Sequence, residues 1–364
     1  LGNANRTGAH LGGTDLDKLP FNTHVVGRAE MERLKFVDPD EFLDRIPGET
    51  QVRNLRIPDG GKGYTLPLLD GIPMENPYEG ATQRLNRTNT FDIERVEIIK
   101  GPSSALYPNN AFGGVVNVVT RDAPAESETL ISLEAGEFNR LRARASTGGS
   151  TQNMGYFFDI NTQNIDGLRD ETVNDREQAS AKIIAHLSDN DTFTTRAEYL
   201  KEDTVSRGDL TAEELDEDNT QAGGLSSATD LEQQTLSFRY EHETDQGYFD
   251  SSLVYREKDT IGLSRFRGPQ DENDTGYNAK LQYTQHWLNW KVIGGYDLYH
   301  GVQDTKQFDR RDLTLSGDFL QFENRLTIHA LYLQSEFEAS RRLTLSAGAR
   351  YEDIRLSSTR YPND

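Results

Sequence analysis

The longest regular feature of the chain is an alternation of apolar and polar residues, which begins near residue 125 and continues to the C-terminal end. Successive side chains of a β-strand point to opposite faces, so the pattern predicts strands with one apolar and one polar face. About eleven such segments, many about ten residues long, are separated by turn-forming residues. Apolar positions in two of them are Tyr277, Ala279, Leu281 and Tyr283, and Leu343, Leu345, Ala347, Ala349 and Tyr351.

The first 125 residues follow a mixed pattern. Apolar residues at helical spacing predict a helix over 28–45, interrupted at Pro39 because proline cannot continue the helical hydrogen bonds. Three short apolar runs, Thr65–Leu69, Val96–Ile99 and Val115–Val119, are bounded by glycine or proline and predict buried strands. This region is therefore expected to form a small α+β domain.

Composition narrows the class of protein. The chain of 364 residues has 60 acidic and 39 basic residues, so its formal net charge is −21, which argues against nucleic acid as a partner. It contains no cysteine, which excludes a disulfide scaffold and a thiolate zinc site. No apolar stretch reaches about 18 residues, so no transmembrane helix is expected. No signal peptide is visible in Leu1–Thr14.

The alternating segments fit two architectures. A soluble sandwich would turn their apolar faces inward, whereas a membrane barrel would turn them outward to lipid and line its interior with polar groups. Alternation alone does not decide between the two. Tyrosine and phenylalanine near the segment ends, together with turns that alternate between short and long, favour the barrel.

Two ordered motifs go beyond these patterns. They run Leu68-Leu69-Asp70-Gly71-Ile72-Pro73 and Ile93-Glu94-Arg95-Val96-Glu97-Ile98-Ile99-Lys100-Gly101-Pro102, the second followed by Gly113-Gly114-Val115-Val116-Asn117-Val118-Val119-Thr120. Each residue alone has an ordinary explanation in turn or strand chemistry. In this order they closely resemble the plug domain of TonB-dependent outer-membrane receptors, and 342–351 resembles barrel strands of the same family.

The resemblance implies an α+β plug domain followed by an antiparallel transmembrane β-barrel. Residues 1–14 would be an N-terminal segment near the TonB box, 15–125 the plug, and 126–364 the N-terminal part of the barrel. The family's barrel has 22 strands, and the remaining residues suffice for about half of them. The chain is therefore expected to be a partial receptor, with a smaller, unusual barrel as the alternative.

Some positions depart from the family pattern. Leu55-Arg56-Ile57 is followed by Pro58, where the family usually has Arg-Gly, and Pro108 replaces a glycine. Ala4-Asn5-Arg6 resembles the end of the segment that engages TonB, but a complete TonB box is not recognisable. These departures weaken any detailed transfer of ligand contacts.

The resemblance implies a function as well as a fold. It implies a monomeric receptor in the bacterial outer membrane that imports a large scarce solute, such as a ferric siderophore or cobalamin, with energy supplied by TonB. No catalytic residues, cofactor or resident metal are expected, and the partners would be TonB, the solute and membrane lipid. The alternatives are a receptor that senses its ligand without transport, and a soluble adhesive or carbohydrate-binding β protein.

Candidate site residues follow from plug geometry in the family. The loop after the Leu-Asp-Gly strand should face outward, and each residue there has the alternative of being an ordinary solvated loop residue. The ligand candidates are Glu75, Asn76, Tyr78, Glu79, Gln83 and Arg84, with Arg53 and Asn54 on a neighbouring loop. The candidates for contacts between plug and barrel are Arg95, Glu97 and Lys100.

Acidic stretches raise a separate question. Three of them, 203–230, 259–275 and 303–318, are expected as long connections between strands. The first contains five carboxylates within 213–218, which could attract Ca²⁺, although Thr211 and Glu214 favour a capped, solvated helical turn. The histidines are scattered and form no metalloprotease motif, and no phosphate-binding loop or serine nucleophile elbow is present.

Overall fold

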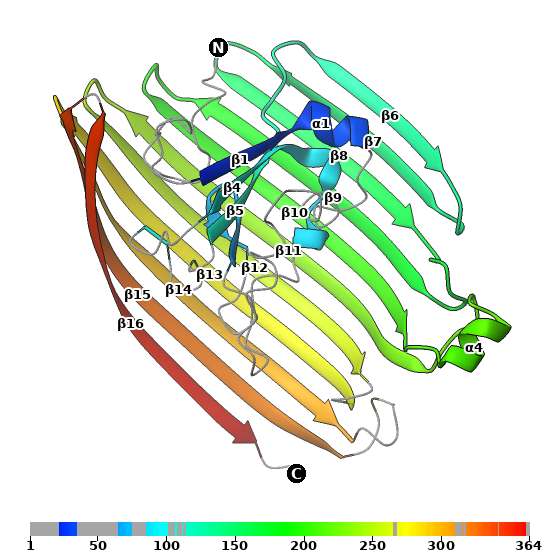
Figure 1. Ribbon diagram of the computed structural model, residues 1–364. Helices are drawn as coiled ribbons and strands as arrows, with labels where there is room; N and C mark the ends of the chain where they lie inside the picture. Colours follow the sequence, from blue (N-terminus) through cyan, green and yellow to red (C-terminus); the bar gives the residue numbers. More distant parts are fainter. Residues whose placement is uncertain are drawn as a thin grey trace.

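The computed structural model describes residues 22–34, 65–74, 85–100, 106–107, 111, 114–264, 268–309, 315, 318–340 and 342–361. These residues form a five-stranded sheet and an eleven-stranded sheet. We call the first the plug sheet and the second the barrel wall. Figure 1 shows the plug sheet lying against one face of the barrel wall.

The plug sheet comes from the N-terminal part of the chain. Its elements are β1 (Asn22–Gly27), α1 (Arg28–Leu34), β2 (Thr65–Leu69), β3 (Ile72–Pro73), the 3-10 helices η3 (Leu85–Arg87) and η4 (Thr90–Asp92), β4 (Ile93–Lys100) and β5 (Gly114–Thr120). The strand order is β1-β4-β5-β2-β3, with β2 parallel to β5. The three predicted strands coincide with β2, β4 and β5. The predicted helix begins as α1, and its remainder lies outside the described residues.

The barrel wall is a meander of antiparallel neighbours from β6 to β16 (Figure 1). Its strands are β6 (Glu128–Ala135), β7 (Leu141–Ser150), β8 (Met154–Asn164), β9 (Val173–His186), β10 (Asp191–Arg207), β11 (Leu225–Glu243), β12 (Gly247–Ser264), β13 (Gly268–Trp287), β14 (Trp290–Phe308), β15 (Phe319–Ser340) and β16 (Leu343–Tyr361). Helix α4 (Ala212–Glu217) lies between β10 and β11. The strand count agrees with the sequence prediction.

The strands are longer than the alternation indicated. The acidic stretch 259–275 is mostly strand, because β12 continues to Ser264 and β13 begins at Gly268. Likewise β10 continues to Arg207 and β14 to Phe308, into stretches that were expected to be connections. The prediction of long acidic loops was therefore wrong in part, since the backbone ladder continues where the apolar positions stop.

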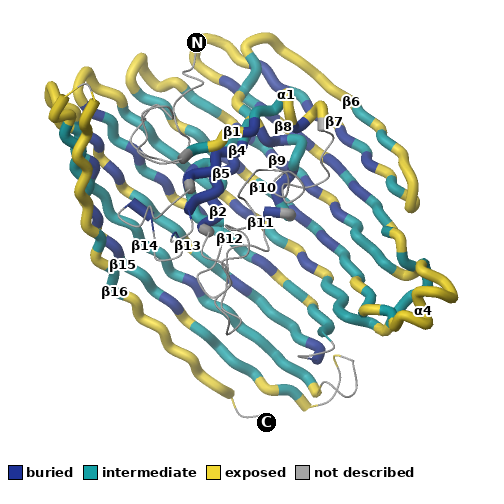
Figure 2. Tube along the Cα trace, viewed as in Figure 1, coloured by how far each residue is buried: buried dark blue, intermediate teal, exposed yellow. Residues whose placement is uncertain are grey.

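The two faces of the barrel wall differ in chemistry. Residues in direct register share a face, so Ala197, Leu236 and Tyr255 lie on one face, and Leu253, which alternates with buried Val254, lies on the same face and is 49% exposed. This outer face is apolar. The opposite, inner face carries buried polar residues where the plug sheet covers it (Figure 2).

Charged and polar rows border the apolar band on the outer face. Lys201 stands in register with Glu177 and Glu232 at the edge of the band nearer α4, which we call its upper edge. Asp191 stands in register with His242 at the opposite, lower edge. Ten residues separate Asp191 from Lys201, which is about 33 Å along a strand and about 25 Å in height at a tilt near 40°. This height matches the hydrocarbon-facing band of an outer-membrane barrel.

Candidate functional site: the interface between the plug sheet and the barrel wall

The segment that contains η3 and η4 lies along the inner face of β7 to β10. Asn89 caps η4 by accepting a hydrogen bond from the Phe91 amide at 3.1 Å, and its side-chain amide donates to Asp159 at 2.8 Å. Arg144 donates to the other oxygen of Asp159 at 2.5 Å and to the Phe91 carbonyl at 2.9 Å. The turn of the plug that precedes β4 is thus tied to two strands of the barrel wall.

Asp92 forms a deeply buried ion pair across the interface. Its carboxylate lies 2.5 Å from the Arg196 guanidinium and accepts a hydrogen bond from the Ser180 hydroxyl at 3.0 Å. The side chains of Asp92 and Arg196 are 1% and 5% exposed. Burial raises the pKa of Asp92 above its ordinary value, although Arg196 opposes the rise. The charged form of the buried Asp92 side chain is therefore stabilised mainly by the Arg196 guanidinium.

The Leu-Asp-Gly motif closes a second polar cluster. Asp70 has φ 49° and Gly71 has φ 82°, and the Asp70 carboxylate accepts hydrogen bonds from the Thr120 amide at 2.8 Å and hydroxyl at 2.6 Å. Burial would raise the pKa of Asp70, but Lys182, Arg196 and the Thr120 hydrogen bonds outweigh it, so the pKa is lowered. The turn motif therefore fastens the end of β5.

Lys182 of β9 links this cluster to the barrel wall. Its ammonium donates to the Thr120 hydroxyl at 3.1 Å, the Arg121 carbonyl at 3.1 Å and the Asp122 carboxylate at 2.8 Å. These acceptors lie where β5 ends and the chain turns toward β6. Lys182 thus holds the covalent junction between the plug sheet and the wall.

Polar contacts also reach the other end of the η3–η4 segment. Arg87 lies 3.3 Å from Glu202, which also pairs with Arg176 at 3.0 Å. Gln178 donates to the Arg87 carbonyl at 2.8 Å.

The guanidinium groups of Arg142 and Arg144 lie 4.3 and 4.8 Å from the centre of the Phe91 ring, within cation–π range.

Among the described residues, an apolar cluster joins the plug to β14 and β15. Ile293 of β14 and Tyr332 of β15 join a buried cluster with plug residues and are 1% and 4% exposed. The Tyr332 hydroxyl donates to Gln282 of the barrel wall itself at 3.1 Å. The plug members of this cluster are Leu66, Leu68, Ile99, Leu106, Tyr107, Ala111 and Val115.

The predicted plug–barrel contacts are only partly described. Arg95 pairs with Glu97 on β4 at 2.8 Å, and Glu97, fully buried, accepts a hydrogen bond from Asn117 of β5 at 3.0 Å. Both contacts lie within the plug sheet. The backbone of Lys100 ends β4, and its side chain lies outside the description. A role for these three residues against the barrel stays a prediction.

The residues found at the interface were mostly missed. Arg142 and Arg144 of β7 and Lys182 of β9 occupy polar, inward-facing positions of strands with an alternating pattern. This placement is the one sequence feature that indicates contact with the plug. Nothing local marks Asn89 or Asp92, because their partners are 70 and 104 residues away in sequence (159 − 89 and 196 − 92).

The predicted ligand residues cannot be placed. Glu75, Asn76, Tyr78, Glu79, Gln83 and Arg84, together with Arg53 and Asn54, lie outside the described residues, as does the segment 1–21 that contains the predicted TonB contact. Their proposed roles stay predictions.

The acidic segment 213–218 lies largely in α4. Thr211 caps this helix, and the Glu214 carboxylate accepts a hydrogen bond from the Thr211 amide at 2.7 Å, which lowers the pKa of Glu214. The favoured capped turn is confirmed. Among the described residues, no group of three or more His, Asp or Glu side chains is arranged to hold a metal ion. Nor is any helix among them long and apolar enough to cross a membrane.

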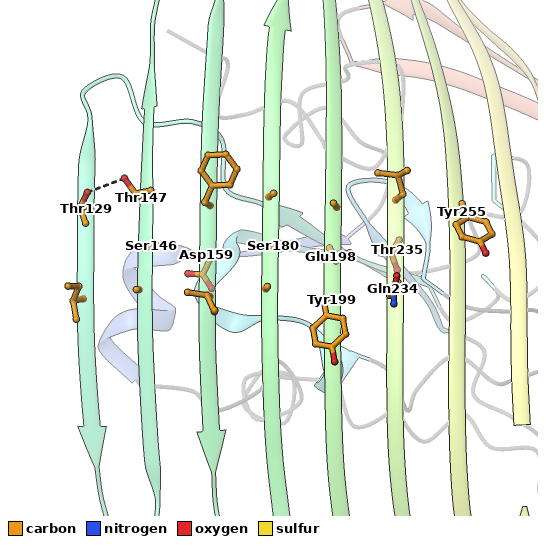
Figure 3. A pocket seen from close by; sticks show the side chains of 18 residues that line it. Thr129, Ser146, Thr147, Asp159, Ser180, Glu198, Tyr199, Gln234, Thr235 and Tyr255 are labelled. Atoms are coloured by element: carbon orange, nitrogen blue, oxygen red, sulfur yellow. Dashed lines mark hydrogen bonds between the residues drawn. The ribbon is translucent and has the colours of Figure 1, made fainter. Parts of the chain in front are cut away.

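One depression of about 910 Å³ lies on the outer face of β6 to β12. Its lining includes the small residues Ala179, Ala181 and Ala197. Tyr199 and Tyr255, labelled in Figure 3, also line it. It belongs to the apolar band and lies on the opposite side of the wall from the plug contacts.

Comparison with known proteins agrees with this architecture. The family model for the TonB-dependent receptor plug domain matches residues 15–115. Vitamin B12 transporter BtuB of Vibrio vulnificus is 28% identical over 209 residues, which are 52% of this chain and 33% of that protein. The iron-regulated outer membrane virulence protein of Vibrio cholerae is 31% identical over 124 residues, 29% of this chain and 18% of that protein.

Solved structures show the same fold. Unliganded ferric citrate transporter FecA superposes with a TM-score of 0.79 at 18% identity, covering 93% of this chain and 57% of FecA. The open form of the ferric-catecholate import receptor Fiu from E. coli K12 gives 0.75 at 13% identity, covering 94% of this chain and 61% of Fiu. The chain thus spans less than two thirds of each of these proteins. The predicted fold class is confirmed, with part of the barrel present.

Proposed function

Because this chain belongs to the TonB-dependent outer-membrane receptors, we propose that the whole protein binds a large, scarce solute at the cell surface and imports it into the periplasm. The protein is located in the bacterial outer membrane. The proposed solute is a ferric siderophore or a similar metal chelate, and TonB supplies the energy. The proposed protein acts as a monomer and makes and breaks no covalent bonds.

One observation carries this proposal. The plug sheet is joined to the inner face of the wall by hydrogen bonds and ion pairs such as Asp92–Arg196, and the outer face of the same strands is apolar. A domain that occupies the interior of a membrane barrel blocks it at rest. Import then requires the plug to shift, and energy from a partner is a direct way to drive that shift.

The relatives support the solute class. One is named a vitamin B12 transporter and another an iron-regulated outer membrane protein, and two similar folds belong to proteins named for ferric citrate and ferric catecholate. Vitamin B12, ferric citrate and ferric catecholates are all metal complexes. Within this chain we propose that Tyr78 stacks on the bound solute and that Arg84 pairs with one of its anionic groups.

Uptake by living cells tests the proposal. The intact receptor is expressed in a host that lacks its own iron and cobalamin receptors, and cells are given radiolabelled ferric citrate, a ferric catecholate or cyanocobalamin. Uptake of at least one probe that disappears when TonB is deleted supports transport. Saturable binding without TonB-dependent uptake of any probe contradicts it and favours the ligand-sensing alternative.

A further inference from the structure

Three wall side chains that bind the η3–η4 segment also bind a second partner on the wall. We call residues 87–92 the latch segment, because they supply the plug partners of Arg196, Glu202 and Asp159. We propose that the latch segment leaves β8 to β10 during transport by an exchange of partners, in which Glu198 positions Arg196. This inference rests on the proposed transport function and adds the part of the interface that releases.

Arg196 of β10 holds two carboxylates at one nitrogen atom. Its Nη2 lies 2.5 Å from the Asp92 carboxylate of the latch segment and 2.5 Å from the Glu198 carboxylate of its own strand. Two negative charges at one donor repel each other, which weakens the bound state. When Asp92 leaves, Glu198 keeps the guanidinium paired, so the wall is spared a buried cation without a counter-charge.

Glu202 of β10 shows the same arrangement with the charges reversed. One of its carboxylate oxygens lies 3.3 Å from Arg87 of the latch segment, and the other lies 3.0 Å from Arg176 of β9. Departure of Arg87 therefore leaves the buried carboxylate with a cation on the wall.

Asp159 of β8 repeats the pattern with neutral partners. One of its oxygens accepts a hydrogen bond from the Asn89 amide of the latch segment at 2.8 Å and another from the Asn161 amide of β8 at 3.0 Å. In all three places the wall keeps a partner of its own, so separation does not strand a buried charge on the wall.

Glu198 lies beside the latch segment. A cavity of about 50 Å³ is lined by Thr88 and Asn89 of this segment and by Ser180 and Glu198 of the wall, among others. This volume exceeds the roughly 10–15 Å³ that one water molecule needs. Water can therefore enter at Glu198 as Asp92 departs.

The reactivity of a single cysteine measures release, since the chain has no native cysteine. Thr88 is 8% exposed and lines the cavity against the wall, so Thr88→Cys should react with a sulfonated maleimide when the latch segment is released. The reaction rate is measured for the intact receptor in vesicles, without solute or TonB, in urea below the concentration that unfolds the barrel. That concentration is determined for each variant and shows that its barrel is assembled.

Glu198→Gln should slow the labelling of Thr88→Cys at least fivefold. It removes the partner that Arg196 keeps after release and leaves the Asp92 pair of the bound state in place, so release becomes less favourable. If Glu198 only stabilised the wall, its loss would loosen the interface and speed the labelling. Unchanged or faster labelling, or no labelling of the natural interface below the unfolding concentration, would overturn the proposal.

Further variants make this test specific to the exchange. Glu198→Asp keeps the carboxylate and should restore the labelling rate to within twofold of the natural value. In a chain that carries Asp92→Asn, Glu198→Gln should no longer slow the labelling, because no plug carboxylate then competes for Arg196. Slowing of the same size in that chain would refute the exchange.

The matched control is an ion pair of the same spacing on the outer face. Glu323 lies 2.6 Å from Arg325, two residues further along β15. Glu323→Gln should change the labelling rate less than twofold, and a larger effect would show that the assay responds to general loss of charge.

Uptake separates this inference from the proposed function. In energised cells, Glu198→Gln should lower the maximal uptake rate of the transported probe at least fivefold at an unchanged half-saturating concentration. Slower labelling in this variant, with undiminished uptake, would overturn the proposal. No uptake of any probe by the natural receptor would refute import and leave the labelling result standing, whereas normal import with unchanged labelling would refute the exchange alone.

Discussion

The inner and outer faces of the barrel wall are made by the same strands and have opposite chemistry. On β10, Arg196 points inward to a buried carboxylate of the plug, and its neighbour Ala197 lies on the apolar face. On β12, buried Val254 is followed by Tyr255 on the outer face. A shift of register by one residue would exchange the two faces, so the alternation sets both the apolar outer face and the inner face that contacts the plug.

Removing the buried cation should have the largest effect on the inner face. Arg196→Ala leaves Asp92 buried without its charge partner, and we expect the free energy of unfolding to fall by about 3–5 kcal/mol. Denaturant unfolding of the intact receptor in detergent measures this. A loss below about 1 kcal/mol would show that the pair is not buried as described.

An arginine on the outer face should be nearly as damaging. Leu253 lies near the middle of the apolar band, so Leu253→Arg is expected to cost about 2–4 kcal/mol in lipid vesicles. Asp259→Arg on the same face of the same strand lies above the band and should cost about 0–1 kcal/mol. Equal costs at the two positions would contradict the assigned membrane level.

The two plug carboxylates should respond to pH in opposite directions. The pKa of Asp70 is lowered in the folded state, so its stabilising contribution is present above about pH 4 and is lost as the pH falls through the folded pKa. The pKa of Asp92 is raised, so the folded state gains relative stability as the pH falls through that value toward the unfolded pKa.

Variant stability curves separate these contributions. Between pH 3 and pH 7, Asp70→Asn should lose less stability on acidification than the natural chain, and Asp92→Asn should lose more. If stability depended on pH in the same way in both variants, the opposite pKa shifts assigned to Asp70 and Asp92 would be contradicted.

The smallest effect is expected at an exposed ion pair of the wall. Arg355 and Asp353 lie 2.8 Å apart on β16 with side chains 74% and 39% exposed. Arg355→Ala should change the free energy of unfolding by about 0–1 kcal/mol, because water screens such pairs. This variant is the matched comparison for Arg196→Ala, and similar losses in the two would remove the distinction between buried and exposed pairs.

The sequence pattern predicts strand positions better inside the apolar band than above it. Inside the band, the alternation of apolar and polar residues predicts the strands of the barrel wall. In the plug sheet, β2, β4 and β5 are predictable because they are buried apolar runs between turn residues. Above the band both faces are polar, so 259–275 lost the periodic signal although β12 and β13 continue there. The alternation of apolar and polar residues therefore indicates where one face of a strand is apolar, and does not indicate where the strand ends.

The interface was less accessible to prediction than the fold. Lys182 and Arg144 could be assigned to the polar face of their strands, but their plug partners lie in a short 3-10 helix, at the end of β5 and in a link without periodicity. Which edge of a small domain meets which strands depends on contacts between distant parts of the chain. Asp70 was recognised as a turn residue, and its bonds to Thr120 emerged only from the packing of β5 beside β2.

The most direct test places single spin labels at adjacent positions of β12 in the membrane-embedded receptor. A label at Leu253→Cys should collide readily with oxygen dissolved in lipid and rarely with a water-soluble nickel complex, whereas a label at Val254→Cys should be shielded from lipid oxygen. Shielding of both labels from lipid oxygen would show that the apolar face packs against protein, and would contradict the lipid-embedded barrel on which import depends.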